Sequence, residues 1–251
     1  GGSMLTAMLL ACTELDIERW DTRALGHLIK AQRACLDFRQ RRLDLAEDVG
    51  PEAARLVELA RTGQLLSRWT SASTVHTSVV DDSGNGCAIT ASSGYGSGEM
   101  PEGTGLWLNN CLGEIELNRR GLDAGPPGAR LPSNMAPSVA RRPGGVLAVG
   151  SPGADRITTA MQQFLINYLQ LGMSLHEAVA HPRVHVDTSG EVINLKAEPG
   201  LDLPEIDLPV SVFKGLVMYF GGVGAAVFDS DTGFDVAADP RREGGVFNPD
   251  A

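Results

Sequence analysis

Positive charge is scarce in this chain. Its 251 residues include 21 Lys and Arg against 31 Asp and Glu, which gives a formal net charge of -10. Because binding to a phosphate backbone requires a basic surface, this composition argues against a nucleic-acid partner. The same acidic balance would keep the chain away from anionic membranes.

Long apolar runs and metal-binding patterns are also missing. No run is long enough to cross a bilayer. The four cysteines, at positions 12, 35, 87 and 111, fit neither a zinc pattern nor CxxC. We expect Cys12 and Cys35, which lie in apolar helical contexts, to be core residues. His176 and His181 are five residues apart, one too many for an HExxH helix, so we predict neither a metal site nor a cofactor.

The first part of the chain has the periodicity of helices. Hydrophobic residues make up 43% of the sequence, enough for a full core. Apolar stripes within residues 4–47 predict two helices, the second capped by Asp21 or Thr22. Its basic end, residues 39–42, is typical of a solvated helix C-terminus. A shorter helix is predicted over residues 52–61.

The remainder alternates strands, loops and helices. Residues 74–81 and 86–93 predict a hairpin with its turn at Gly84 and Asn85. Residues 94–105 and 113–144 are rich in Gly or Pro and are predicted to be mostly loop. Further elements are a strand at 146–149, a helix at 155–172, a short helix capped by Ser174 and Glu177, and strands at 191–196, 210–213, 225–229 and 234–238. This order fits a layered α+β sandwich.

The hydroxyl-rich first strand of the hairpin suggests chemistry. Thr74, His76 and Ser78 alternate, so on a strand they share one face. A Thr that cleaves its own preceding peptide bond acquires a free amine beside its hydroxyl, and the two form a nucleophile and base. The alternative interpretation is an amphipathic strand whose polar residues face water. The stretch by itself fits both.

Residues 74–81, TVHTSVVD, resemble the start of the small subunit of the γ-glutamyltranspeptidases, which are self-processing N-terminal nucleophile hydrolases. Five further segments follow in that family's order. They are GYGSG at 94–98, GTGLWLNN at 103–110, LPSNMAP at 131–137, GSPGADR at 150–156 and ADPR at 238–241. Residues 1–73 resemble the end of the family's large subunit more loosely.

The resemblance implies an organisation in two parts. Residues 1–73 would be the C-terminal part of the large subunit and residues 74–251 the small catalytic subunit, with self-cleavage between Ser73 and Thr74. The implied fold is the four-layer αββα sandwich of N-terminal nucleophile hydrolases, incomplete in this chain. The implied partner is the missing N-terminal part of the large subunit, in a heterodimer or higher oligomer. Family members are often periplasmic or secreted, and the compartment of this chain stays open.

The resemblance also implies catalytic roles. Thr74 would be the nucleophile, and its amine, with an ordinary pKa of about 7.7–8.0, would serve as the general base. Ser92 corresponds to a hydroxyl residue that hydrogen-bonds the nucleophile. Gly153 and Ala154 correspond to the residues whose backbone N–H groups form the oxyanion hole. For His76 we favour a structural role over tuning of the Thr74 amine.

Substrate contacts are implied at four positions. Ser133 and Asn134 correspond to a pair that contacts the glutamate α-carboxylate. Glu114 corresponds to the acidic residue that holds the α-ammonium group, and Ser93 lies near a residue that assists. Cys111 replaces a polar or acidic residue of that site.

The implied reaction is cleavage of γ-glutamyl amides such as glutathione through a γ-glutamyl ester on Thr74. Because the loop at 116–130 lacks an aromatic residue to cover the site, we expect hydrolysis more than transfer. One alternative is an acylase that accepts groups such as glutaryl, which Cys111 and Ser93 leave open. Another is a non-catalytic fragment or subunit that needs a partner chain.

Overall fold

A computed structural model describes most of the chain. The described residues are 1–12, 17, 19–61, 74–94, 96–113, 125–188 and 192–249.

The first part is helical, as its periodicity predicts. It contains α1 (Gly2–Leu10), α2 (Thr22–Arg41), a short 3-10 turn (Leu43–Leu45) and α3 (Val49–Arg61). Asp21 caps α2, since its Oδ1 accepts the N–H of Ala24 at 2.8 Å. Cys12 and Cys35 are fully buried, which confirms them as core residues.

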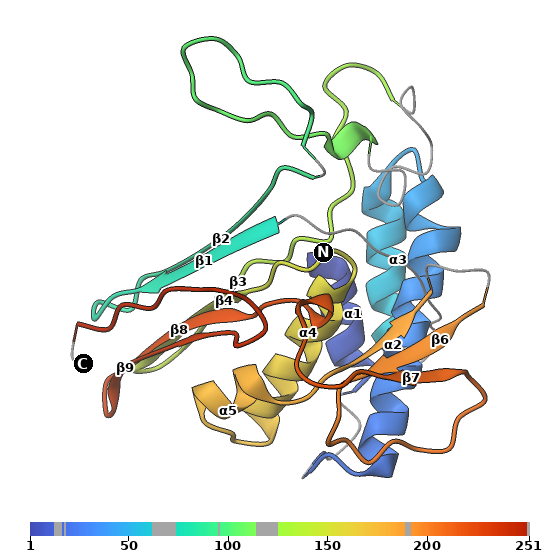
Figure 1. The fold of residues 1–251 in the computed structure, drawn as a ribbon, viewed down its shortest axis with the longest axis vertical. Coiled ribbons are helices and arrows are strands. Elements are labelled where there is room, and N and C mark those ends of the chain that lie inside the picture. Colours follow the sequence, from blue (N-terminus) through green and yellow to red (C-terminus); the bar gives the residue numbers. More distant parts are fainter. Residues whose placement is uncertain are drawn as a thin grey trace.

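Two sheets lie face to face after this helical part (Figure 1). The first is the antiparallel hairpin of β1 (Thr74–Val80) and β2 (Gly86–Ser92). The second has the order β3-β4-β8-β9 and is antiparallel throughout. Its strands are β3 (Ser138–Arg142), β4 (Gly145–Gly150), β8 (Gly224–Asp229) and β9 (Gly233–Ala238). Strand β1 packs on β4 and β8.

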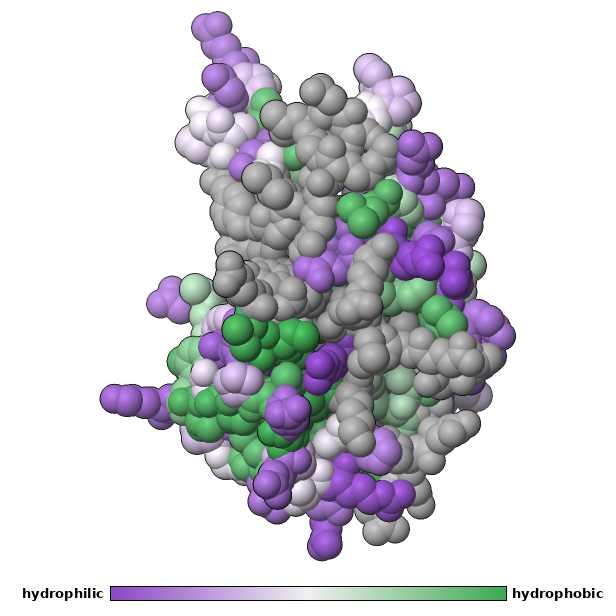
Figure 2. All heavy atoms as spheres, turned by 90° about the vertical axis from the view of Figure 1, so that its right-hand side faces the viewer, coloured by the Kyte–Doolittle hydropathy of each residue, from purple (hydrophilic) through white to green (hydrophobic). Residues whose placement is uncertain are grey.

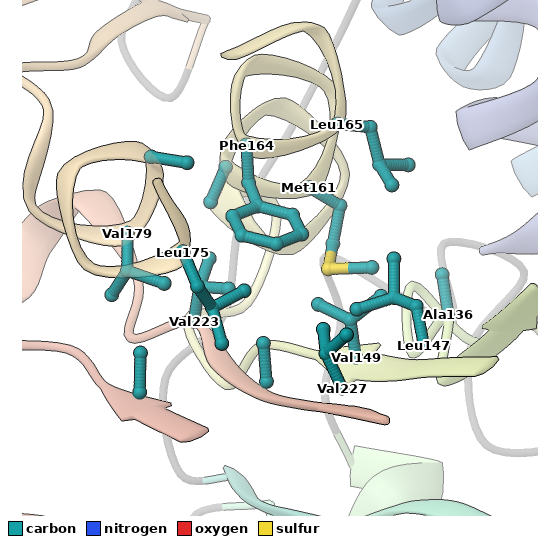
Figure 3. Close-up of a cluster of buried hydrophobic side chains, with 14 of the residues drawn as sticks. Ala136, Leu147, Val149, Met161, Phe164, Leu165, Leu175, Val179, Val223 and Val227 are labelled. Carbon is teal, nitrogen blue, oxygen red and sulfur yellow. The ribbon is translucent and has the colours of Figure 1, made fainter. Parts of the chain in front are cut away.

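Helices cover the other face of the second sheet. They are α4 (Arg156–Leu165), which continues into a π-helical turn (Ile166–Gln170), and α5 (Leu175–Ala180), which begins with the predicted capping box. Figure 3 shows Met161 and Phe164 of α4 pointing toward the second sheet, with Met161 beside Leu147 and Val149 of β4. The described residues therefore supply three successive layers: hairpin, sheet and helices.

A third, small sheet lies beside α2. It contains β5 (Val184–Asp187), β6 (Asn194–Ala197) and β7 (Val210–Val212), with β5 packed against α2. Two further 3-10 turns are Cys111–Gly113 and Met218–Phe220.

Two strands differ from the sequence prediction. Strand β3 lies within residues 113–144, which we predicted to be mostly loop, and β5 was not predicted. Four of the five residues of β3 are exposed, and all four of β5 are buried. Neither strand therefore shows the alternation that identifies a half-buried strand.

Candidate active site

Strand β1 turns its polar face toward the protein. Thr74, His76 and Ser78 are buried or half-buried, whereas Val75 and Val79 are 69% and 56% exposed. This confirms that the three polar residues share one face. The alternative, in which these polar residues face water, is wrong for all three, because the exposed face of the strand carries Val75, Thr77 and Val79 instead.

The Thr74 hydroxyl is held across the hairpin. Thr74 is 8% exposed and lies opposite Ser92 in the strand register. Its Oγ1 donates to Ser92 Oγ at 3.3 Å, and Ser92 Oγ accepts the N–H of Gly94 at 3.0 Å. The register of β1 against β2 thus places the Ser92 hydroxyl opposite Thr74, the first residue of β1.

The imidazole of His76 fills the space between the two sheets. Its Nδ1 lies 2.8 Å from Thr90 Oγ1, and its Nε2 lies 2.7 Å from Ser78 Oγ. The ring sits against Gly150 and Gly224, and a side chain at Gly150 would clash with it. Burial lowers the pKa of His76 to about 4, so the ring is neutral at pH 7. Both ring nitrogens are occupied, which fits the structural role that we favour.

Gly153 and Ala154 form a strained loop before α4. Their φ angles are 129° and 64°, and Ala154 is the one non-glycine residue with positive φ in the described ranges. A left-handed conformation costs an L-residue about 1–2 kcal/mol, and such strain clusters at functional sites. Among the described residues, neither backbone N–H donates to a protein acceptor. Two free donors at a helix N-terminus can stabilise an oxyanion.

A pocket of about 920 Å³ opens beside Thr74. It is lined by the whole of β1, by Pro152, by residues 222–226 and by residues of the C-terminal segment 241–249. Pro152, which immediately precedes Gly153, lines the pocket together with Thr74, whereas Gly153 and Ala154 are not among the described residues that line it.

The predicted substrate residues are only partly brought together. Ser133 is exposed, and Asn134 is buried with its Nδ2 donating to Asp155 Oδ1 at 2.6 Å. Neither is among the described residues that line the pocket. Ser93 is half-buried directly after Ser92. Glu114, like Ser73, lies outside the described residues.

Sequence reasoning missed a buried ion-pair cluster beside the loop. Arg39 is 3% exposed, so our prediction of a solvated helix end was wrong for this residue. Its Nη1 lies 2.8 Å from Asp155 Oδ1, and its Nε lies 3.0 Å from Asp44 Oδ1. Burial opposes the charge of Arg39, but the two carboxylates hold its pKa above the usual range. Burial raises the pKa of Asp155, although Arg39 opposes the shift.

Comparison with known proteins identifies the family. The family model described as gamma-glutamyltranspeptidase matches residues 33–248. The chain belongs to the gamma-glutamyltranspeptidase family. The match begins in α2 and includes the hairpin, the strained loop and β9, so both parts of the predicted organisation contribute to it.

Individual relatives agree. The chain is 35% identical over 137 residues to a glutathione hydrolase proenzyme of Pseudomonas sp. (strain A14), a match that covers 49% of the chain and 24% of the relative. It is 32% identical over 192 residues to the acylase ACY 1 proenzyme of Pseudomonas sp. (strain V22), covering 74% and 30%. The chain thus spans about a quarter to a third of the length of these relatives.

A solved structure extends the agreement to the fold. It is a gamma-glutamyltranspeptidase from Pseudomonas nitroreducens complexed with L-DON. The match has a TM-score of 0.56 and 26% identity, and covers 69% of the chain and 98% of the matched chain. The chain therefore has the α+β sandwich fold of N-terminal nucleophile hydrolases, of which the described residues supply three layers.

Proposed function

We propose that this chain is the C-terminal part of a self-processing amide hydrolase that cleaves γ-glutamyl amides through an ester on Thr74. The observation that carries the proposal is the environment of Thr74. It is the first residue of β1, it is buried, its hydroxyl is held by Ser92, and it opens onto the large pocket. Family membership supplies the chemical class.

The first reaction is self-cleavage. Thr74 Oγ attacks the carbonyl carbon of Ser73, and the peptide C–N bond breaks as the acyl group moves from nitrogen to oxygen. Water then hydrolyses the ester, which leaves a carboxylate on Ser73 and a free α-amine on Thr74. This amine is partly neutral at pH 7 because its ordinary pKa is about 7.7–8.0.

The second reaction is turnover. The Thr74 amine takes the Oγ proton while Oγ attacks the γ-carbonyl of the substrate, and the backbone N–H groups of Gly153 and Ala154 stabilise the oxyanion. The proton passes to the leaving amine as the amide bond breaks. Water then hydrolyses the γ-glutamyl ester. This route needs neither a metal nor a cofactor.

We assign the remaining contacts to the γ-glutamyl group. Ser133 and Asn134 would hold its α-carboxylate, and Glu114 with Ser93 would hold its α-ammonium group. His76 would keep β1 in place on the second sheet by packing against Gly150 and Gly224, while its two hydrogen bonds orient the ring within the hairpin.

Intact mass after incubation at neutral pH tests the proposal. We expect a split between Ser73 and Thr74, absent in Thr74→Ala, together with release of an aniline from a γ-glutamyl anilide. A chain that stays uncut, even when the missing N-terminal part of the large subunit is supplied, would contradict the catalytic proposal. It would leave a non-catalytic subunit or fragment as the better account.

An acylase is the second candidate. The acylase relative aligns with 74% of this chain, against 49% for the glutathione hydrolase relative. A glutaryl anilide differs from a γ-glutamyl anilide only by the missing amino group. Equal or faster cleavage of the glutaryl compound would show that no ammonium pocket is used and would favour the acylase.

The partner proposal rests on an exposed apolar surface. Val75, Val79 and Ile89 on the outer face of the hairpin are each more than half exposed. Such a patch usually marks an interaction surface. We propose that the preceding part of the large subunit covers it and completes the sandwich.

A further inference from the structure

A second cavity lies where the segment between β6 and β7 passes α2 (Figure 1). Its volume is about 490 Å³, within the range of about 300–1,000 Å³ that is usual for small-molecule sites. One wall is a face of α2 and the other is the segment 204–208. Among the described residues, none lines both this cavity and the pocket beside Thr74, so the two are separate.

The two walls are joined at one end of the cavity. Thr22 Oγ1, at the start of α2, donates to Asp202 Oδ2 at 3.0 Å. One turn along the helix, Gly26 faces Pro204, and a Cβ added at Gly26 would lie 3.7 Å from Pro204 Cγ. Because Gly26 has no side chain, the helix leaves the space in front of this position open.

The walls carry opposite charges. Arg23, His27 and Arg33 lie on the helical wall, whereas Glu205 and Asp207 lie on the facing segment. In the part of the chain that the structure describes, none of these five side chains forms an ion pair or a hydrogen bond. A ligand with one negative and one positive group therefore finds a complementary charge on each wall.

The surface between these charges is apolar. Ile29 of α2 is 4% exposed and belongs to the core, and Pro204, Ile206 and Leu208 are half-buried on the facing segment. An apolar group of a ligand would leave water on contact with them. The cavity thus fits an apolar body that carries a charge of each sign at separate points.

We propose that this cavity binds a short zwitterionic peptide with an apolar side chain. The peptide carboxylate lies beside Arg23 and Arg33, its α-ammonium group lies beside Glu205 and Asp207, and its side chain packs on Ile29. The site takes no part in bond cleavage and is independent of the proposed function. Because α2 precedes the proposed cut and residues 204–208 follow it, a bound peptide connects the two parts and stabilises the folded protein.

Calorimetry with the Thr74→Ala chain tests the site in the absence of turnover. The probes are alanylleucine, its N-acetyl derivative, which lacks the ammonium group, and its C-terminal amide, which lacks the carboxylate. We expect each derivative to bind about fivefold more weakly than alanylleucine, because a charge contact near water contributes modestly. Equal binding of all three would overturn the proposal. So would the absence of alanylleucine binding to a protein that circular dichroism shows to be folded.

Charge variants in the Thr74→Ala chain identify the wall that each group contacts. The double variant Arg23→Met, Arg33→Met should weaken binding of alanylleucine about fivefold and leave the C-terminal amide unchanged. The double variant Glu205→Gln, Asp207→Asn should do the same for alanylleucine and leave the N-acetyl derivative unchanged. Equal losses on all three probes would show that the charges act on the fold and would overturn the assignment.

A steric variant locates the binding. Gly26→Leu places a side chain in the cavity and should abolish binding of alanylleucine, whereas Arg55→Met, at an exposed position of α3, is the matched control and should retain it. With alanylleucine at ten times its Kd, the midpoint of thermal unfolding should rise by about 3–5 °C in Arg55→Met but not in Gly26→Leu. Undiminished binding in Gly26→Leu would place the peptide elsewhere and overturn the proposal. The charge variants keep the test decisive if Gly26→Leu does not fold.

Discussion

Arg39, Asp44 and Asp155 form a buried cluster that connects α2 to the loop before α4. Asp155 Oδ1 accepts from both Arg39 and Asn134, so a single carboxylate oxygen joins three segments of the chain. Asp155 also directly follows Ala154, whose backbone N–H we assign to the oxyanion hole. The cluster therefore holds the Gly153–Ala154 loop in place through Asp155, without contact to the substrate.

Removal of one charge from this cluster should destabilise the folded protein. Arg39→Met leaves Asp155 buried without its cation, and we expect it to lower the free energy of unfolding by about 3–5 kcal/mol. Asp155→Asn should recover part of that loss in the double variant, because the uncompensated charge is gone. Urea unfolding measures all three proteins, with Arg55→Met at an exposed position of α3 as the control. Strictly additive losses would show that the two residues are not coupled.

His76 should make stability depend on pH. Its pKa falls from 6.5 to about 4 on folding, so the unfolded state binds a proton that the native state does not. Stability is then fully present above about pH 6.5 and decreases as the pH falls toward 4. Because the ring is only half-buried, we expect a contribution of about 1 kcal/mol, less than the full shift would give.

Unfolding curves between pH 4 and 7 check this prediction. The free energy of unfolding should depend less steeply on pH in His76→Gln than in the wild type. Part of this pH dependence of stability should remain in His76→Gln, because burial also lowers the pKa of His185, to about 3. Identical slopes for wild type and His76→Gln would refute the assignment to His76.

At the scale of elements, the hairpin depends on a glycine opposite the His76 ring. Gly150→Ala would push a methyl group into this ring, so β1 would have to move away from β4. We expect a loss of about 1–3 kcal/mol and slower self-cleavage, because Thr74 moves with the strand. Gly215→Ala, with open space around its position, is the control. Equal stability of the two variants would show that the sheets are not held together at this point.

Some elements could be predicted from the sequence because local rules determine them. The capping box of α5 and the turn at Gly233, where φ is 79°, are of this kind. Strand β3 was missed because its pairing with buried β4, and not its own pattern, defines it. The roles of Thr74 and Ser92 were predicted from the resemblance of the sequence to a known family. Asp155 pairs with a residue 116 positions away, and no local pattern indicates such a contact.

At the scale of the whole molecule, the parts before and after the proposed cut are interlocked. Helix α1 packs on α4, and α2 packs on β5. Gln162 Nε2 donates to the carbonyl of Met8 at 3.1 Å in the buried interior. Hydrophobic residues also reach the surface away from the hairpin, as the lower part of Figure 2 shows. The cut thus divides the chain within one packed unit.

We therefore expect the two parts to stay together after cleavage. Native mass spectrometry of the processed protein should show one complex, and denaturing conditions should separate it into two chains. The physical reason is the apolar core that both parts share, which includes Leu28 of α2 and Val184 of β5. Dissociation at neutral pH without denaturant would contradict the interlocked arrangement.

The Arg39–Asp155 pair has a consequence for inheritance. Its two members are encoded on opposite sides of the proposed cut, yet each leaves a buried charge behind if the other is lost. A lineage that replaced the arginine would be expected to replace the aspartate as well. Positions 39 and 155 should therefore change together across relatives. If the gene were divided at codon 74, Arg39 and Asp155 would be encoded by separate genes, although the two side chains must still pair in the folded protein.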